Sequence, residues 1–181
     1  KCDFIRCYNA FGKKERNKLY QLTDLYSLFY LRFVKDYSGG DKNHWEHLID
    51  TTAPWRGYAY EQVCLHHIPQ IKKKLGITGV VSNNFAWRQV ASDDMPAMQI
   101  DLLIDRNDNT INLCEIKFSE SRFKINSDYE LTLRERMSAF KAMKKNKHKS
   151  LQITFVTTFG VAKNNHSGIV QNEVVLDDLF E

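Results

Sequence analysis

Residues 98–117 constrain the fold of this chain more than any other segment, because they predict two β-strands joined by a tight turn. Residues 100–104 and 111–113 are rich in strand-forming side chains, and the Asn/Asp cluster at 107–109 tolerates left-handed turn conformations. Charged side chains occupy positions where these strands should be most buried. They are Asp101, Glu115 and Lys117.

The spacing of the three charges predicts that they lie together. Side chains alternate along a strand, so Glu115 and Lys117 share one face. A three-residue turn pairs Arg106 with Thr110 and brings Asp101 opposite Glu115, where directly opposed Cβ atoms lie ~5 Å apart. A shift of one residue in the register would move Asp101 to the other face of the sheet.

Two carboxylates at this separation repel each other, and burying them without a partner is unfavourable. A divalent cation between Asp101 and Glu115 would remove the repulsion, and Mg²⁺ prefers hard oxygen ligands of this kind. Lys117 would then lie beside the metal. The alternative is an ordinary ion pair between Glu115 and Lys117 at a solvated strand edge, and such pairs contribute little to stability. The matching acid at Asp101 favours the metal hypothesis.

Asp101, followed after 13 intervening residues by Glu115-Ile116-Lys117, resembles the metal-binding signature of the restriction-endonuclease-like, PD-(D/E)xK, superfamily of nucleases. In that superfamily an acid on one strand is followed by acid-x-Lys on the next. The proline that often precedes the first acid is replaced here by Ile100. The resemblance implies a catalytic cofactor, Mg²⁺ or alternatively Mn²⁺, bound by Asp101, Glu115 and the Ile116 carbonyl. It also implies that Lys117 orients the attacking water or stabilises the developing charge.

Residues 54–75 are predicted to form the first core helix, with a proline near its first turn and Gly76 suited to its C-cap. Glu61 extends an apolar stripe at helical spacing. The stripe comprises Cys64, Leu65, Ile68 and Leu75. The resemblance implies that Glu61 is the helix acid of the superfamily and a fourth catalytic residue, contacting the same metal directly or through water. The alternative is a boundary glutamate paired with a lysine.

The order of predicted elements gives the fold class. A helix, a strand, the 98–117 hairpin, a second helix and another strand follow one another between residues 54 and 160. The predicted strands besides the hairpin are 78–89, 151–160 and 170–176, and the second helix is 129–147. We therefore expect an α/β (α+β) fold with a mixed central β-sheet flanked by helices, in the order α-β-β-β-α-β. That order is also the core order of the nuclease superfamily.

Residues 1–53 are predicted to form a separate unit, a β-hairpin over 3–23 followed by an apolar helix over 25–34. That helix should be buried on several sides or pack against a part outside this chain. The basic hairpin, the aromatic helix and the segment 55–61 resemble the C-terminal part of bacterial and archaeal AAA-type ATPases. In those proteins a winged-helix segment precedes a nuclease-like domain. The resemblance implies a winged-helix remnant over 1–53, a nuclease domain over 54–181, and an ATPase domain before residue 1. This chain itself carries no P-loop motif.

Basic residues gather in two segments of a chain whose formal net charge is +4. Residues 1–20 hold six Lys or Arg against two acids, and residues 131–150 hold seven against one. Such segments suit the phosphates of nucleic acids. The candidate contacts are Lys13 and Lys14 at the hairpin tip and Arg134, Lys141 and Lys144 on the second helix. The alternatives are a solvated turn and a helix end favoured by the helix dipole.

Four cysteines without metal-ligand spacing indicate reduced thiols, and the chain has no apolar run long enough to span a membrane. We therefore expect a cytoplasmic protein. The basic segments and the resemblance to nucleases imply that its partner is nucleic acid, with DNA favoured over RNA. A homodimer is one expectation, because nucleases that cut both strands are often dimers. Two alternatives keep the same fold without catalysis: a nucleic-acid-binding module, which would show salt-dependent DNA binding without cleavage, and an ATPase-docking domain, which would show neither.

Overall fold

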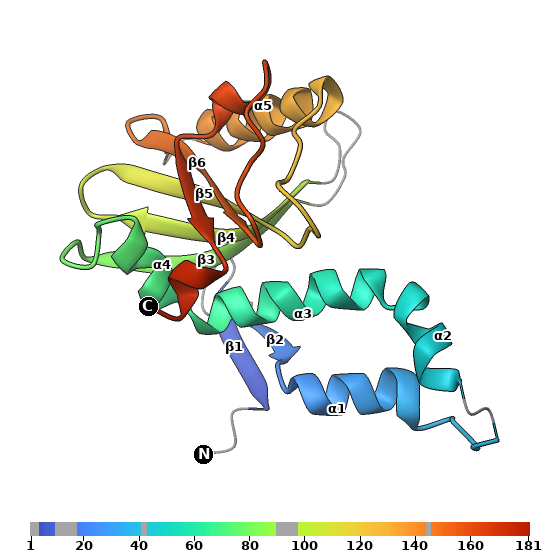
Figure 1. Ribbon diagram of the computed structural model, residues 1–181. Helices are drawn as coiled ribbons and strands as arrows, with labels where there is room; N and C mark the ends of the chain where they lie inside the picture. Colours follow the sequence, from blue (N-terminus) through green and yellow to red (C-terminus); the bar gives the residue numbers. More distant parts are fainter. Residues whose placement is uncertain (1–3, 10–17, 41–42, 90–97, 144–145) are drawn as a thin grey trace.

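The computed structural model describes residues 4–9, 18–40, 43–89, 98–143 and 146–181 (Figure 1). Its centre is a five-stranded sheet in the order β3-β4-β5-β6-β7. The strands are β3 (Ser82–Gln89), β4 (Met98–Arg106), β5 (Thr110–Lys117), β6 (Ser150–Thr157) and β7 (Asn172–Val175). The strands β3, β4 and β5 pair antiparallel, whereas β6 pairs parallel with both β5 and β7. The predicted mixed sheet is confirmed.

Helices cover both faces of this sheet. The helices α3 (Ala53–His66) and α4 (Ile68–Lys74) lie on one face, and α5 (Ser127–Ala142) lies on the other (Figure 1). The chain therefore runs in the predicted order α-β-β-β-α-β before it reaches β7. Two short 3₁₀-helices, Ser167–Ile169 and Asp177–Leu179, flank that last strand.

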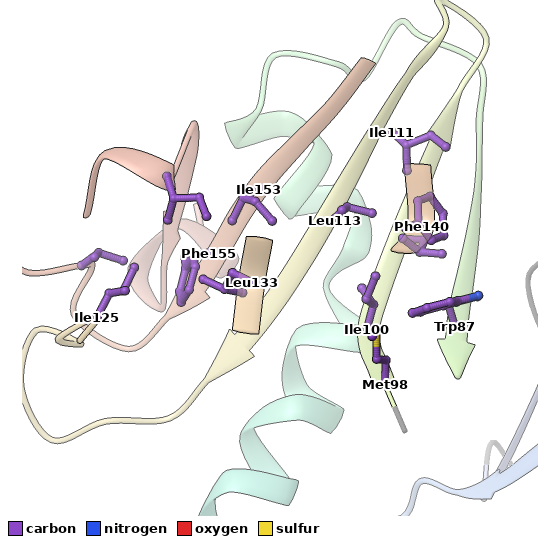
Figure 2. Close-up of a cluster of buried hydrophobic side chains, with 13 residues drawn as sticks. Trp87, Met98, Ile100, Ile111, Leu113, Ile125, Leu133, Phe140, Ile153 and Phe155 are labelled. Carbon is purple, nitrogen blue, oxygen red and sulfur yellow. The ribbon is translucent and has the colours of Figure 1, made fainter. Parts of the chain in front are cut away.

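Two hydrophobic clusters hold the layers together, one on each face of the sheet. Along β5 the side chains alternate between them: Leu113 packs toward α5, whereas Cys114 packs toward α3. Figure 2 shows the cluster on the α5 side, where Trp87 meets the Phe140 ring at right angles, with ring centroids 5.4 Å apart. A strand buried on both faces reads as a near-continuous apolar run, which explains the sequence of β5.

The predicted register of the β4–β5 hairpin is confirmed. Leu102 pairs with Cys114, and the pairing continues to Asp105 and Ile111. Continued by one residue beyond the Leu102–Cys114 pair, the same register places Asp101 opposite Glu115. At the turn, Asn109 has a φ of +60°, the left-handed conformation that asparagine tolerates better than most residues. Local turn chemistry therefore sets the pairing that brings the two acids together.

The predicted first helix, 54–75, is divided at His67 into α3 and α4. Pro69 explains the break, because it has no N–H to donate to the Leu65 carbonyl and its ring obstructs the preceding turn. The C-cap of α4 is Leu75, and Gly76 directly after it has the left-handed φ of +69° expected of a glycine that ends a helix. One long helix was therefore the wrong prediction, whereas its end point was correct.

Other element boundaries also differ from the prediction. The second core helix begins at Ser127, because the Asn126 side chain accepts a hydrogen bond of 2.9 Å from the Tyr129 N–H and caps it. It ends at Ala142 and not at 147, and the buried Asn146 amide donates to the Phe140 carbonyl at 2.9 Å. The strand predicted over 78–89 begins only at Ser82.

The N-terminal segment contains the predicted hairpin, β1 (Ile5–Asn9) paired antiparallel with β2 (Lys18–Leu22). The helix α1 (Leu25–Phe29) follows, capped as expected by Asp24, whose carboxylate accepts the Ser27 N–H at 2.7 Å. A π-helical turn over Tyr30–Val34 extends it, and α2 (His44–Thr51), which was not predicted, comes next.

Of the two alternatives for the apolar helix over 25–34, burial on several sides is wrong, whereas packing against a part outside this chain stays a prediction. Tyr26 on that helix is 76% exposed. The helix packs through the rings of Phe29 and Phe33, which lie 5.3 and 6.1 Å from Trp55 of α3, and Phe29 also stacks on Trp45 of α2 at 6.3 Å. The hairpin also contacts α3, since the hydroxyl of Tyr58 on that helix donates to the Leu22 carbonyl at 3.1 Å. The N-terminal segment thus lies against the outer face of α3 (Figure 1).

The proposed division of the chain at residue 53 stays a prediction. In the part of the chain that the structure describes, no helix combines the length and the apolar character needed to cross a membrane.

Substituting Leu133 should test the packing of α5 on the sheet. The Leu133 side chain is 0% exposed, whereas Leu131 on the same helix is 59% exposed. We expect Leu133→Ala to lower the free energy of unfolding by ~2–5 kcal/mol, because it leaves a cavity. The same change at Leu131 should stay within ~0.5 kcal/mol. Urea denaturation followed by circular dichroism measures both, and equal losses would contradict this orientation of α5.

Candidate active site

A β-bulge lies at the first predicted acid. Two residues of β4, Asp101 and Leu102, lie opposite the single residue Ala86, where the pairing with β3 shifts register between Phe85 and Trp87. Bulges of this kind bend a strand and redirect its side chains, and they are frequent beside active sites. The sequence analysis predicted the register with β5 but not this irregularity with β3.

The bulge interrupts the alternation of side chains along β4. Ile100 and Leu103 both pack in the cluster on the α5 side, although residues three apart on a regular strand point to opposite faces. Leu102 packs in the cluster on the α3 side. Asp101 therefore lies at the position where the alternation of side chains along β4 is interrupted.

Asp101 is fixed by the backbone of the neighbouring strand. Its Oδ2 accepts the Ile116 N–H at 3.1 Å, just beyond the Leu102–Cys114 pair that begins the β4–β5 ladder. The side chain thus replaces a backbone carbonyl in the ladder. Because the N–H and C=O of a strand residue point toward the same neighbouring strand, the Ile116 carbonyl faces the same gap.

Glu115 is a buried carboxylate with an exposed fraction of 2%. Both of its oxygens accept hydrogen bonds from α5: Oε1 from the Arg136 Nη1 at 2.8 Å, and Oε2 from the Tyr129 hydroxyl at 2.9 Å. A buried charge requires such partners. Burial, followed by the nearby negative charge of Glu115, raises the pKa of the Tyr129 hydroxyl, so it stays a donor.

Tyr129 and Arg136 are functional candidates that the sequence analysis missed. They share a helical face with Leu133 and Phe140, at positions i, i+4, i+7 and i+11. An arginine within an apolar stripe, on a helix that follows a strand bearing a buried glutamate, was the signal that could have identified them.

Lys117 joins the two carboxylates. Its Nζ lies 3.5 Å from Glu115 Oε2 and 3.8 Å from Asp101 Oδ2. The structure therefore brings together the three residues that the spacing predicted. Lys117 and Arg136 supply two positive charges against the two negative charges of the carboxylates, which makes this group of four electrically balanced.

Glu61 lies across a pocket of about 90 Å³ from this group. The polar lining residues are Arg6, Glu61, Asn84, Gln99 and Asp101, and the apolar ones include Leu65, Ile68 and Leu102. Burial, followed by repulsion from Asp101, raises the pKa of the Glu61 carboxyl to about 7, against the opposing effect of Lys117 and Arg6. Burial also raises the pKa of Asp101, opposed first by Lys117.

The donor atoms at this site suit a hard divalent cation. Asp101, Glu115 and the Ile116 carbonyl offer oxygen ligands of the kind that Mg²⁺ and Mn²⁺ take, and Glu61 can contribute through water. The arrangement seen is nonetheless an ion-pair network and not a closed coordination shell. Among the described residues, no three His, Cys, Asp or Glu side chains converge closely enough to hold a metal ion.

The predicted nucleic-acid contacts on α5 lie away from the carboxylates. Arg134 is exposed and forms an ion pair with Glu130 on its own helix, with Arg134 Nη2 2.5 Å from Glu130 Oε1. Lys141 donates to the Lys149 carbonyl near the other end of α5. Lys13, Lys14 and Lys144 fall outside the described residues. Arg136 is the cation of the described part of α5 that reaches the site.

Comparison with known proteins gives little information about this chain. No protein-family model matches it, and no curated protein sequence matches it. Among solved structures, it is similar to a protein of unknown function, AF1548, with 14% sequence identity and a TM-score of 0.41. The alignment covers 66% of this chain and 64% of AF1548, so the chain spans less than two thirds of that protein's length. Function is therefore argued from the site itself.

The raised pKa of Glu61 predicts a pH-dependent stability. With a folded-state pKa of about 7 against an ordinary value of 4.5, the folded protein holds the Glu61 proton more tightly than the unfolded chain does. This group's stabilising effect is therefore full below about pH 4.5 and is lost as the pH rises through about 7. We expect Glu61→Gln to gain stability relative to the wild type between about pH 5 and about pH 8.

Urea denaturation at the two pH values measures this difference. Glu135→Gln, an exposed substitution of the same chemistry on α5, is the matched control and should keep a constant difference from the wild type. A constant difference for Glu61→Gln as well would show that its carboxyl titrates normally.

Proposed function

We propose that this chain is a metal-dependent nuclease domain that hydrolyses phosphodiester bonds, with DNA favoured over RNA. The observation that carries the proposal is the position of Lys117, within 3.5 and 3.8 Å of the Glu115 and Asp101 carboxylates. Asp101, Glu115 and Lys117 lie just beyond the end of the β4–β5 pairing, beside a pocket that Glu61 also lines. The sequence resemblance to the restriction-endonuclease-like superfamily supports the same assignment.

The residues divide the work of hydrolysis between them. A bound Mg²⁺ or Mn²⁺ would make water more acidic and stabilise negative charge on the phosphate. Asp101, Glu115 and the Ile116 carbonyl would hold it, with Glu61 acting directly or through water. Lys117 places an ammonium group where it can orient the attacking water and stabilise the charge that develops on the phosphate oxygens.

The hydrogen bonds around the site fix this arrangement before substrate binds. The Ile116 N–H holds Asp101, and Arg136 with Tyr129 holds Glu115. Groups already oriented need no reorganisation during the reaction, which is the main source of electrostatic catalysis. Partners that orient ligand residues also tune their basicity. Arg136 and Tyr129 are therefore positioning residues for Glu115.

A non-catalytic module with the same fold is the second candidate. The observation that favours it is that both Glu115 oxygens already accept hydrogen bonds from protein donors. Such a module would bind DNA or dock the ATPase domain that the sequence resemblance implies. The exposed aromatic side chain of Tyr26 on α1 is a candidate contact for such docking. A cytoplasmic location and a homodimer remain part of the proposal.

Cleavage assays test the catalytic proposal. Supercoiled plasmid and single-stranded DNA are incubated with Mg²⁺ or Mn²⁺, and with EDTA as the metal-free reference. We expect Asp101→Asn and Lys117→Met to lower the cleavage rate by ~10²–10³, because each removes one electrostatic group from the site. Asp108→Asn, in the exposed β4–β5 turn, and Lys163→Met, 81% exposed, are the matched controls and should keep full activity.

Two outcomes would contradict the assignment in different ways. Cleavage that persists in both site variants would mean that the activity does not come from Asp101 and Lys117. Folded protein that binds DNA in a salt-sensitive manner but does not cut would favour the non-catalytic module.

A further inference from the structure

The N-terminal hairpin turns one arginine toward the body of the protein. Arg6 of β1 pairs with Gln21 of β2, and both side chains are partly buried. The flanking positions Ile5, Cys7 and Tyr20 are exposed. Since side chains alternate along a strand, Arg6 lies on the inner face of the hairpin and these three lie on the outer face.

Arg6 lines the same pocket as Glu61 and Asp101. The pocket is therefore built from distant parts of the chain: β1 supplies Arg6, α3 supplies Glu61, and β4 supplies Asp101 and Gln99. Direct packing of β1 near β3 holds the hairpin at this position. A segment that the sequence assigned to a separate unit thus forms one wall of the candidate active site.

The charge of Arg6 acts on the site electrostatically. It lowers the pKa of Glu61, in the direction opposite to burial and to the charge of Asp101. The charged side chains of the site then form a series in which the two acids Glu61 and Asp101 are flanked by cations. In order they are Arg6, Glu61, Asp101, Lys117, Glu115 and Arg136. Arg6 closes this series at the pocket end, where the lining also presents the exposed amides of Asn84 and Gln99.

We propose that Arg6, with the Asn84 and Gln99 amides, forms a binding subsite for a backbone phosphate of the DNA substrate. The inference rests on the proposed nuclease function and adds a subsite to it. A phosphate entering this pocket without Arg6 would meet the negative charges of Glu61 and Asp101. The guanidinium group offsets that repulsion, and its planar set of donors matches phosphate oxygens in pairs. Each amide adds two N–H donors.

The conventional explanation is that Arg6 is only a counter-ion for Glu61. The two roles differ in how DNA binding responds to salt. A side chain that neutralises a phosphate releases a counter-ion from the DNA, so its removal reduces the salt dependence of binding. A counter-ion buried within the protein changes the stability of the fold but leaves that dependence unchanged.

Fluorescence anisotropy with a fluorescein-labelled DNA tests the proposal in EDTA, where the metal-dependent reaction is blocked. Affinity is measured over a series of salt concentrations for the full chain. We expect Arg6→Gln to weaken binding roughly tenfold and to reduce the slope of log K against log salt by about 0.9, the contribution of one phosphate contact. Arg32→Gln, an exposed substitution of the same chemistry after α1, should change neither.

A second variant keeps the test decisive if Arg6→Gln does not fold, as judged by thermal denaturation. Arg6→Lys keeps the positive charge but loses the planar set of donors, so it should keep the salt slope and lose several-fold in affinity. If the foldable variants bind with wild-type affinity and wild-type slope, the subsite is refuted. If Arg6→Gln changes only the pH dependence of stability, Arg6 is a counter-ion and the subsite is again refuted.

The plasmid assay separates this inference from the nuclease proposal. Wild-type protein that cleaves DNA while Arg6→Gln binds and cleaves equally well would refute the subsite alone. Wild-type protein that binds through Arg6 but never cleaves would refute the nuclease proposal and leave the phosphate subsite standing. Wild-type protein without salt-dependent DNA binding would refute the subsite directly.

Discussion

Burial of the Glu115 charge is the constraint on which the rest of the structure depends. A carboxylate with 2% exposure, placed inside a sheet, loses its hydrogen bonds to water and needs fixed protein donors to replace them. β5 supplies one cation within two residues, Lys117, but the hydrogen bonds to both oxygens come from α5. α5 must therefore pack on the sheet at a position from which Tyr129 and Arg136 can reach Glu115 on β5. The buried side chains of Leu133 and Phe140, on the same face of α5, fix the position of the helix on the sheet. One position of α5 therefore both fills the hydrophobic core and supplies the partners of Glu115.

Local chemistry made part of this arrangement predictable. The Asn/Asp turn and the alternation of residues were enough to place Asp101 opposite Glu115, and the helical stripe was enough to identify the buried face of α5. The division of the first helix also has a local cause, Pro69, so the sequence alone contains the signal for it. The partners of Glu115 and the bulge beside Asp101 depend instead on how α5 docks on β5 and how β3 meets β4. Those contacts join residues far apart in the chain, and no local pattern specifies them.

α3 connects the two parts of the molecule because it has two buried sides. Cys64 faces the sheet, whereas Trp55 and Tyr58 face the N-terminal segment, and Glu61 lies at the edge of the sheet-facing side. This explains how a segment with a strongly aromatic helix can associate with the core while leaving Tyr26 exposed. It also explains why an N-terminal hairpin can reach the pocket: the same helix that carries the acid carries the surface on which the hairpin rests.

The bulge in β4 makes the site depend on chain length as well as on residue identity. Two residues of β4 share one partner on β3, so removing a single residue there would restore a regular strand. The side chain at the Asp101 position would then point to the other face of the sheet. Adding one residue to the turn after Arg106 would instead slide Asp101 past Glu115. Variation among related chains should therefore take the form of substitutions along β4 and β5, with insertions and deletions confined to segments outside this hairpin.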